Sequence, residues 1–379
     1  MLMNQNNLRQ IFQQYIDRFE YCNTDGRDEY YKWQACQEFP ILMKKALSSS
    51  DEELSRALYE AKKATYNIID SYTQPFYGLV EFAKDQPDKV RGILTDLYAD
   101  DGGDLKAQME KIADFFKRCD ELSKDSFLFK QNSHSVSALL FLNDPDHHYM
   151  YKATQSKAFA DCVEFYDDWG SGDNIKLDVY YRMCDELVSE IKNCKELLDV
   201  DASRFDGRLK INGGDLHPDT EKHLLAFDII YCSTVYDLYG GVSYTKRDMK
   251  EKQAFISNKA KAETLKQELD KAKADMDALI EVKAALESMI VVGDTINHVR
   301  NGVGTVKKWD GNHITIAFPE KEAVFGFMTL IANNLITVDK PGFAEKIAEN
   351  RDIIKKHDII PHTLDRAARA LEPYEEFLN

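Results

Sequence analysis

The feature that most constrains this chain is a regular repeat of apolar residues between positions 255 and 290. Eleven positions follow one another at alternating spacings of three and four, and nine of them are apolar. No Gly or Pro interrupts the run, which therefore has the signature of a coiled-coil seam about five heptads long. At 1.5 Å per residue, the predicted helix is roughly 50 Å long. The positions are Phe255, Asn258, Ala262, Leu265, Leu269, Ala272, Met276, Leu279, Lys283, Leu286 and Ile290.

Two interpretations of this seam remain open at the level of sequence. The first is an arm that forms a homodimer through 255–290 or spaces two domains. Asn258 and Lys283 would then weaken the seam but could fix its register. The second is a long helix that folds back on the N-terminal part of the same chain, since the alanines of the seam suit close intramolecular packing.

The period of the apolar pattern changes on both sides of the seam. From residue 8 to about 245, apolar residues recur three and four apart, which is typical of helices. After residue 291 they alternate, which is typical of strands. The sequence thus predicts a mainly α protein with a small β domain. Its expected parts are an acidic all-α domain (1–245), a coiled-coil helix (246–290), an SH3/Tudor-like barrel (291–340) and C-terminal helices (341–379).

The alternating region contains four clear strand candidates, at 295–299, 304–309, 313–318 and 323–327. Asp310-Gly311-Asn312 separates the second from the third and has the composition of a hairpin turn. Four or five short strands within about 50 residues suggest a small barrel of the SH3-like kind.

Charge limits which partners the first domain can have. The chain has a net charge of −16, and residues 1–245 hold 28 Lys and Arg against 43 Asp and Glu. Because neutralisation of phosphates supplies most non-specific nucleic-acid affinity, this region should repel a phosphate backbone overall. No apolar run approaches the ~20 residues that span a bilayer, and no signal peptide is apparent, so we expect a cytoplasmic protein without a membrane partner. Seven scattered cysteines without a CxxC pair are expected to be reduced core thiols.

Motifs for catalysis are weak. The turn Asp144-Pro145-Asp146-His147-His148 gathers groups that can bind metal, but neighbours in one turn rarely converge on one ion without distant ligands. Those ligands could be His134, His217 or His223. The chain has no GxSxG elbow and no D…ExK arrangement of a nuclease. We therefore assign no catalytic residue, no metal site and no cofactor.

Two groups of residues are candidates for binding. Tyr149, Tyr151 and Lys152 could form a recognition surface, because aromatic rings beside a cation suit stacking. The alternative is that the tyrosines pack in the core. In the barrel, Arg300, Lys307, Lys308 and Trp309 could contact a ligand or phosphates, or they could simply form a solvated strand edge. Strict alternation would place Lys307 and Trp309 on one side and Lys308 on the other.

Several stretches of residues 8–245 resemble the N-terminal region of McrB-like AAA+ proteins of restriction and phage-defence systems. The most distinctive is the Phe-Leu-x-x-Pro-Asp-x-x-Tyr-x-Tyr-Lys run at 141–152, and the others are at 30–33, 82–91 and 223–231. In that family such regions precede a nucleotide-hydrolysing motor and are thought to recognise targets or partners. This chain departs from the pattern because it has no GxxxxGK[ST], so motor activity is not implied.

The barrel resembles the Tudor-like C-terminal domain of UvrD-type helicases. The residues that carry this resemblance are at 292–294, 298, 302–306 and 314–318. In that family the domain is a docking module for protein or nucleic acid. The helicase core is absent here, so the resemblance implies docking without unwinding.

These observations favour a non-enzymatic recognition or adaptor protein of a bacterial restriction or phage-defence module. Its expected partner is a protein, such as an AAA+ motor or a nuclease of the same system, or a modified target. A second hypothesis is a DNA- or RNA-binding regulator that acts through the barrel. A third is a metal-dependent hydrolase that uses the Asp144–His148 turn.

Overall fold

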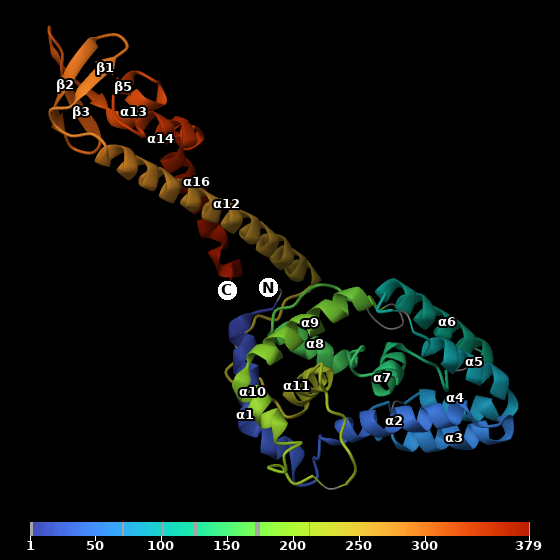
Figure 1. Ribbon diagram of the computed structural model, residues 1–379. Helices are drawn as coiled ribbons and strands as arrows, with labels where there is room; N and C mark the ends of the chain where they lie inside the picture. Colours follow the sequence, from blue (N-terminus) through green and yellow to red (C-terminus); the bar gives the residue numbers. More distant parts are fainter. Residues whose placement is uncertain are drawn as a thin grey trace. The chain divides into compact units, whose positions relative to one another are not determined.

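The computed structural model describes residues 3–69, 72–100, 102–124, 127–170, 175–211 and 213–378 (Figure 1). The chain divides into two compact units, Met1–Asp248 and Met249–Asn379. We call them unit 1 and unit 2 and describe each by itself. The long helix, the sheet and the C-terminal helices thus belong to one unit.

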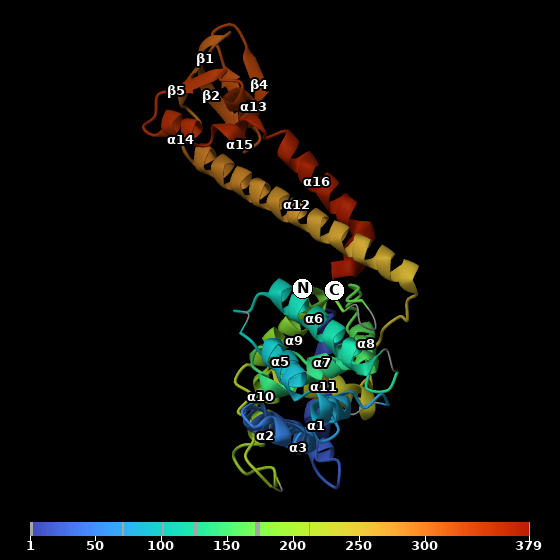
Figure 2. The same cartoon turned by 90° about the vertical axis from the view of Figure 1, so that its right-hand side faces the viewer.

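Unit 1 is helical, as predicted for residues 1–245, and no strand occurs among its described residues. Its helices are α1 (Gln5–Asn23), α2 (Tyr31–Leu47), α3 (Asp51–Lys63), α4 (Pro75–Asp85), α5 (Pro87–Leu97), α6 (Leu105–Ser123), α7 (Ser133–Asn143), α8 (Ala153–Cys162), α9 (Leu177–Asn193), α10 (Lys195–Ala202) and α11 (His223–Val235). Helices α7 and α11 are apolar on nearly every face, and most of their residues are buried. A helix with that composition belongs in the core of a larger protein, and both views show these two helices among the others (Figures 1 and 2).

The start of α11 is fixed by a buried carboxylate. Asp219 accepts hydrogen bonds from the backbone N–H groups of Leu224 (3.0 Å) and Leu225 (2.9 Å), which have no partner within the helix. Burial has the largest effect on the pKa of Asp219 and raises it to about 6. The two hydrogen bonds act in the opposite direction. Asp219 thereby determines where α11 begins in the core.

Unit 2 joins one long helix to a small sheet and short C-terminal helices. Its elements are α12 (Met249–Ser288), β1 (Thr295–His298), β2 (Gly302–Trp309), β3 (His313–Ala317), β4 (Glu322–Gly326), α13 (Phe327–Ala332), β5 (Ile336–Val338), α14 (Phe343–Glu349), α15 (Arg351–Lys355), α16 (Ile359–Leu371) and the 3₁₀ helix η1 (Glu372–Leu378). The sheet is antiparallel, with strand order β4-β3-β2-β1-β5. A mainly α protein with a small β domain is therefore confirmed.

The sheet packs one face against the core of unit 2. Ile296, Val306, Ile314 and Ile316 are completely buried there and belong to the same apolar cluster as Leu286 of α12. The four predicted strands are present within a few residues, and Gly311 adopts a left-handed conformation (φ +87°) in the predicted hairpin turn. β5 and the short helix α13 were not located from the sequence.

Every position of the predicted seam on α12 is buried or partly buried, so the face was predicted correctly. What covers it is the chain's own C-terminal segment. Helix α16 runs alongside α12 in both views (Figures 1 and 2). Near the end of η1, the rings of Phe255 and Phe377 meet edge to face at 5.4 Å, and Lys261 donates a hydrogen bond to the Tyr374 hydroxyl (2.7 Å).

Two further findings concern the whole chain. All seven cysteines are free thiols, and six of them are buried, as expected for core residues. Among the helices that the structure describes, none combines the length and the apolar content needed to cross a membrane.

Candidate recognition surfaces and a buried charge cluster

The first predicted recognition surface is not on the surface. Tyr149 and Tyr151 are only 4% and 6% exposed. The Tyr149 ring lies tilted against His223, with ring centres 4.0 Å apart, and its hydroxyl donates to Asp185 (2.8 Å). The Tyr151 ring packs edge to face on Tyr180 at 5.1 Å. Both tyrosines therefore pack in the core, which was the alternative interpretation of their sequence.

Lys152, the third residue of that group, lies at the boundary between core and solvent. It is partly buried and directly precedes α8, and its ammonium lies 5.1 Å from the centre of the Tyr231 ring. Burial lowers the pKa of His134 to about 4, and the charge of Lys152 adds to this effect. All three residues precede helix α8, which begins at Ala153.

The Asp144–His148 turn does bring histidines near carboxylates. Asp144 lies 2.9 Å from His147 Nδ1, and His217 Nε2 lies 3.9 Å from Asp146. His223 Nδ1 lies 3.2 Å from the backbone oxygen of His148. His134 is not part of this group, because its ring bonds to the backbone oxygen of Ile68 (3.0 Å).

A hollow of about 590 Å³ adjoins this turn and is lined by Asp100, Asp144 and Asp185, among others. Within the part of the chain that the structure describes, however, no three ligand atoms of this turn come together in the manner of a metal site. The hollow is therefore acidic but has no recognisable ligand set.

Besides Asp219, five charged side chains of unit 1 are each no more than 4% exposed, and ion pairs join them. They come from the loop before α2, from α2 itself, from the α10 region and from α11. We call Glu29, Lys32, Asp201, Arg204 and Asp228 the buried charge cluster. This cluster was not predicted from the sequence, although the single Asp inside the apolar run of α11 was a signal for it.

Asp228 is the centre of this cluster. One carboxylate oxygen accepts from the Lys32 ammonium, and the other accepts from the Tyr15 hydroxyl and from Arg204 Nη2 (3.1 Å). Lys32 Nζ lies 2.8 Å from Glu29 Oε2, and Arg204 Nε donates to Asp201 (3.2 Å). The cluster thereby ties α1, α2, α10 and α11 together.

Electrostatics keep Asp228, Lys32 and Arg204 charged despite burial. Burial raises the pKa of Asp228, but the positive charges of Lys32 and Arg204 outweigh it, so that its pKa is lowered overall. For Lys32, burial lowers the pKa, but the surrounding groups, Asp228 first and Glu29 among them, together outweigh burial and raise it. Aromatic rings add to this stabilisation. The guanidinium of Arg204 lies 3.9 Å from the centre of the Trp33 ring.

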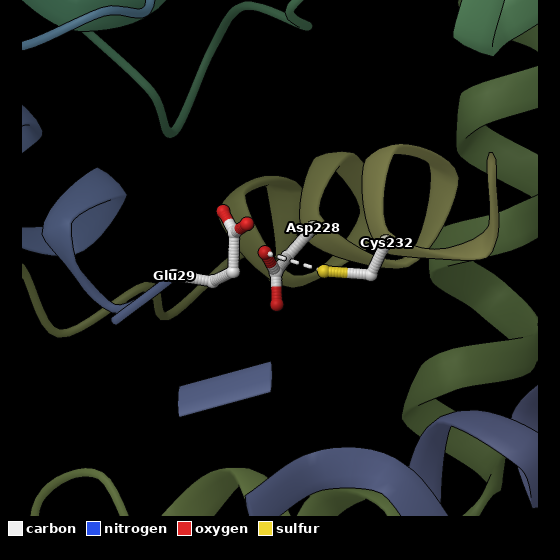
Figure 3. Close-up of side chains that lie close together, drawn as sticks. All are labelled: Glu29, Asp228 and Cys232. Atoms are coloured by element: carbon white, nitrogen blue, oxygen red, sulfur yellow. Dashed lines mark hydrogen bonds between the residues drawn. The ribbon is translucent and has the colours of Figure 1, made fainter. Parts of the chain in front are cut away.

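One trio in this region has the spacing of metal ligands. Glu29, Asp228 and Cys232 offer atoms within 4.8 Å of one another, and no other such group occurs among the described residues (Figure 3). The donor set does not fit a metal ion, because the Lys32 ammonium already binds both carboxylates. Burial also raises the pKa of the Cys232 thiol, which donates to Asp228 (3.4 Å) instead of ligating as a thiolate.

Three exposed apolar side chains of unit 1 lie on two loops and were not predicted from the sequence as a site. Tyr72 is 89% exposed, Phe127 is 67% exposed and Leu128 is 48% exposed. The rings of Tyr72 and Phe127 lie 6.3 Å apart. We call these three residues the loop-tip surface.

The two loops are fastened to each other. Phe129 N–H donates to the Thr73 oxygen (2.7 Å), and the Thr73 hydroxyl donates to the Lys130 oxygen (3.2 Å). Gln74 and Phe129 both adopt left-handed backbone angles (φ +48° and +73°). Bulky residues in that region are strained, and such strain is often found at ligand-binding sites.

An open hollow of about 610 Å³ is lined in part by Gln74 and Pro75, which closely follow Tyr72 in the chain. Its floor is apolar, with Ile69 and Phe76 each 1% exposed. The remaining lining residues are Tyr59, Lys62, Gln74, Pro75 and Tyr77. An apolar floor with a few polar groups at its rim is the usual composition of a ligand pocket.

In unit 2, a β-bulge decides where the predicted binding residues point. Val306 pairs with Ile316 and Lys308 with Thr315, so Lys307 is the extra residue of β2. Both lysines are exposed, whereas Trp309 is partly buried and packs edge to face on Phe327 at 4.4 Å. The prediction that Lys307 and Trp309 share one side was wrong, because a bulge breaks the alternation of side chains.

The outer face of the sheet presents apolar and basic side chains together. Lys308, Thr315 and Val324 are paired across β2, β3 and β4, and Val324 is 64% exposed. Arg300 is exposed in the turn between β1 and β2, and Val303, near the start of β2, is 59% exposed.

No protein-family model, curated protein or solved structure matches this chain.

Proposed function

We propose that this chain is a recognition or adaptor protein of a bacterial restriction or phage-defence module, located in the cytoplasm. The observation that carries the proposal is that each unit presents its own exposed apolar surface. Unit 1 has the loop-tip surface, and unit 2 has the outer face of its sheet, with Val303 and Val324. Large exposed apolar residues beside polar ones are typical of sites that bind other proteins. The resemblance to McrB-like N-terminal regions supports the biological setting.

The test is a pull-down of the full-length chain from its host, with and without nuclease treatment. One variant combines Tyr72→Ser with Phe127→Ser, and a second combines Val303→Ser with Val324→Ser. We expect protein partners that survive nuclease, and we expect each variant to lose a different partner. If both variants retain every partner, or if purified protein hydrolyses nucleotides or nucleic acid robustly, the adaptor proposal fails.

A second function, nucleic-acid binding through the sheet, is supported by the bulge that turns both Lys307 and Lys308 outward. Together with Arg300 they could contact phosphates. The affinity for a labelled 20-base-pair DNA should then fall as salt rises, and each alanine substitution should reduce the salt slope by roughly 1. An affinity that does not change with salt would rule this function out.

A further inference from the structure

Strand β4 lies at the edge of the sheet in unit 2, and one side of its backbone has no strand partner among the described residues. We propose that an extended apolar segment of another protein adds to this edge as a further strand, beside Val324. This inference rests on the proposed adaptor function and specifies how unit 2 holds its partner, through backbone hydrogen bonds along β4.

The pairing of β4 with β3 decides which backbone groups of β4 face away from the sheet. Phe327 N–H, directly after β4, donates to the Asn312 oxygen (2.9 Å), which marks a bonded pair of residues. Bonded and non-bonded pairs alternate along an antiparallel ladder. The register of β4 therefore assigns the bonds with β3 to Phe325 and Ala323. The N–H and C=O groups of Val324 point away from β3, as do those of the residue two positions earlier.

This edge lacks the features that usually keep other strands away, which are shortness, proline, lysine and bulges. The opposite edge, β5, is only three residues long. Strand β4 has five residues, Glu-Ala-Val-Phe-Gly, and its register with β3 is unbroken. Val324 at its centre is 64% exposed, and Glu322 is exposed as well. The edge is thus open to an added strand, and Figure 2 shows β4 at the border of the sheet.

The side chains of β4 indicate that the added segment is apolar. On the outer face of the sheet, Val324 is paired with Thr315 and has no strand neighbour on its other side. On the inner face, Ala323 and Phe325 are only partly buried, and the Phe325 ring stacks on His298 at 5.1 Å. An added strand would place one side chain beside Val324 and the next beside Phe325. β-Branched and aromatic residues suit both positions.

The size of the edge favours a flexible segment over a second copy of this chain. Two copies joined through β4 would be folded bodies that meet over five residues each. Stable interfaces between folded proteins involve about 20 to 30 residues a side. A segment that adds as a strand needs a smaller contact, because its backbone hydrogen bonds supply much of the affinity and its alternate side chains supply the specificity.

The experiment selects random peptides displayed on phage against the full-length protein, with the Val324→Pro variant for counter-selection. Proline at this position removes an N–H that faces away from β3, and edge strands tolerate proline there. Val324→Lys is a second edge variant, which keeps the N–H and adds a charge to the edge. Val303→Lys is the matched control, because it adds the same charge at another exposed valine, in a strand that is not at an edge. All three variants should keep the wild-type melting temperature.

We expect the enriched peptides to share a stretch of β-branched or aromatic residues without proline. Their affinity should fall about tenfold or more in both edge variants and remain unchanged in Val303→Lys. Because only one side of an added strand bonds to β4, N-methylation of the peptide should abolish binding at alternate residues and have little effect at the residues between them. On the protein side, peptide binding should slow hydrogen exchange at the N–H groups of Glu322 and Val324.

Equal binding by wild type and the edge variants, or the absence of any enriched peptide, would overturn the proposal. An effect of N-methylation that does not alternate along the peptide would also overturn it. A wild-type dimer that Val324→Pro dissociates would assign the edge to a second copy instead. If the Val303→Ser/Val324→Ser variant loses a pull-down partner that Val324→Pro retains, strand addition fails while the adaptor function stands.

Discussion

At the scale of residues, the central fact is that ionic groups inside unit 1 are paired with one another. Lys32 lies between Glu29 and Asp228, and Arg204 lies between Asp228 and Asp201. Such networks contribute little when intact, since desolvation offsets attraction, but removal of one member leaves a buried charge without a partner. The cluster thus makes the arrangement of four helices depend on single side chains.

The first prediction concerns Lys32→Met. It should lower the free energy of unfolding of unit 1 by about 3 to 5 kcal/mol, because Glu29 and Asp228 lose their shared cation. Urea unfolding followed by tryptophan fluorescence measures this loss. Lys63→Met is the matched control, because Lys63 pairs with Glu60 at the surface and should cost less than about 1 kcal/mol. Equal losses of unfolding free energy in the two variants would show that the buried charge cluster stabilises unit 1 no more than a surface ion pair does.

The second prediction concerns pH. Because the pKa of Asp219 is raised to about 6 in the folded protein, above about 4 when unfolded, the folded state takes up the proton first as pH falls. The free energy of unfolding should therefore rise by about 1 kcal/mol as the pH falls from 7 to 5, because Asp219 takes up a proton in the folded state over this range. Asp219→Asn should not show this gain. Denaturant unfolding at both pH values, compared between wild type and variant, isolates it, and parallel changes in the two proteins would contradict it.

At the scale of elements, the change of period along the chain was enough to predict most of unit 2. The seam, the strands and the hairpin turn were visible because each depends on neighbours in sequence. The element that covers the seam could not be predicted, because no feature of the neighbouring sequence shows that α16 packs on α12. Apolar residues of α16 recur at a regular spacing of their own, at Ile360, Leu364, Ala367 and Leu371. The cluster around Asp228 was missed for the same reason, because it depends on contacts between distant segments. The bulge at Lys307 was missed because the side chains of β2 were expected to alternate without interruption.

The third prediction follows from the cover over α12. A homodimer through 255–290 requires the C-terminal segment to leave, so the wild-type chain should be monomeric with respect to this seam. Leu371→Asp places a carboxylate at a position only 5% exposed and should loosen α16. Light scattering after size exclusion should then show dimers, and trypsin should cleave faster at Arg366 and Arg369. His362→Asp, at an exposed position of α16, is the control, because it leaves both cleavage sites in place. A monomeric Leu371→Asp variant with faster cleavage would show that the seam does not dimerise.

At the scale of the whole molecule, two apolar cores are present, one in each unit. A core of its own is what allows a domain to fold independently. The sequence predicted the boundary near 245 from the change in charge and period, and the structural division follows Asp248. The sites were harder to predict, because the loop-tip surface is formed by segments more than fifty residues apart.

The fourth prediction is that residues 1–248 and 249–379 fold when produced separately. Thermal unfolding of the full chain should then resolve into two transitions that match those of the fragments. Lys32→Met should shift only the transition of unit 1. A single transition that moves as a whole in this variant would indicate that the units are stabilised by each other.

The buried charge cluster has a consequence for how such a chain can change over generations. A substitution at Lys32 would be harmful until Asp228 or Glu29 changed as well, so these sites can drift only in concert. The acidic exterior has no such restriction. In relatives of this protein, the residues equivalent to Lys32 and Asp228 should therefore change together or not at all. Such paired changes would still be recognisable after the rest of the sequence has diverged.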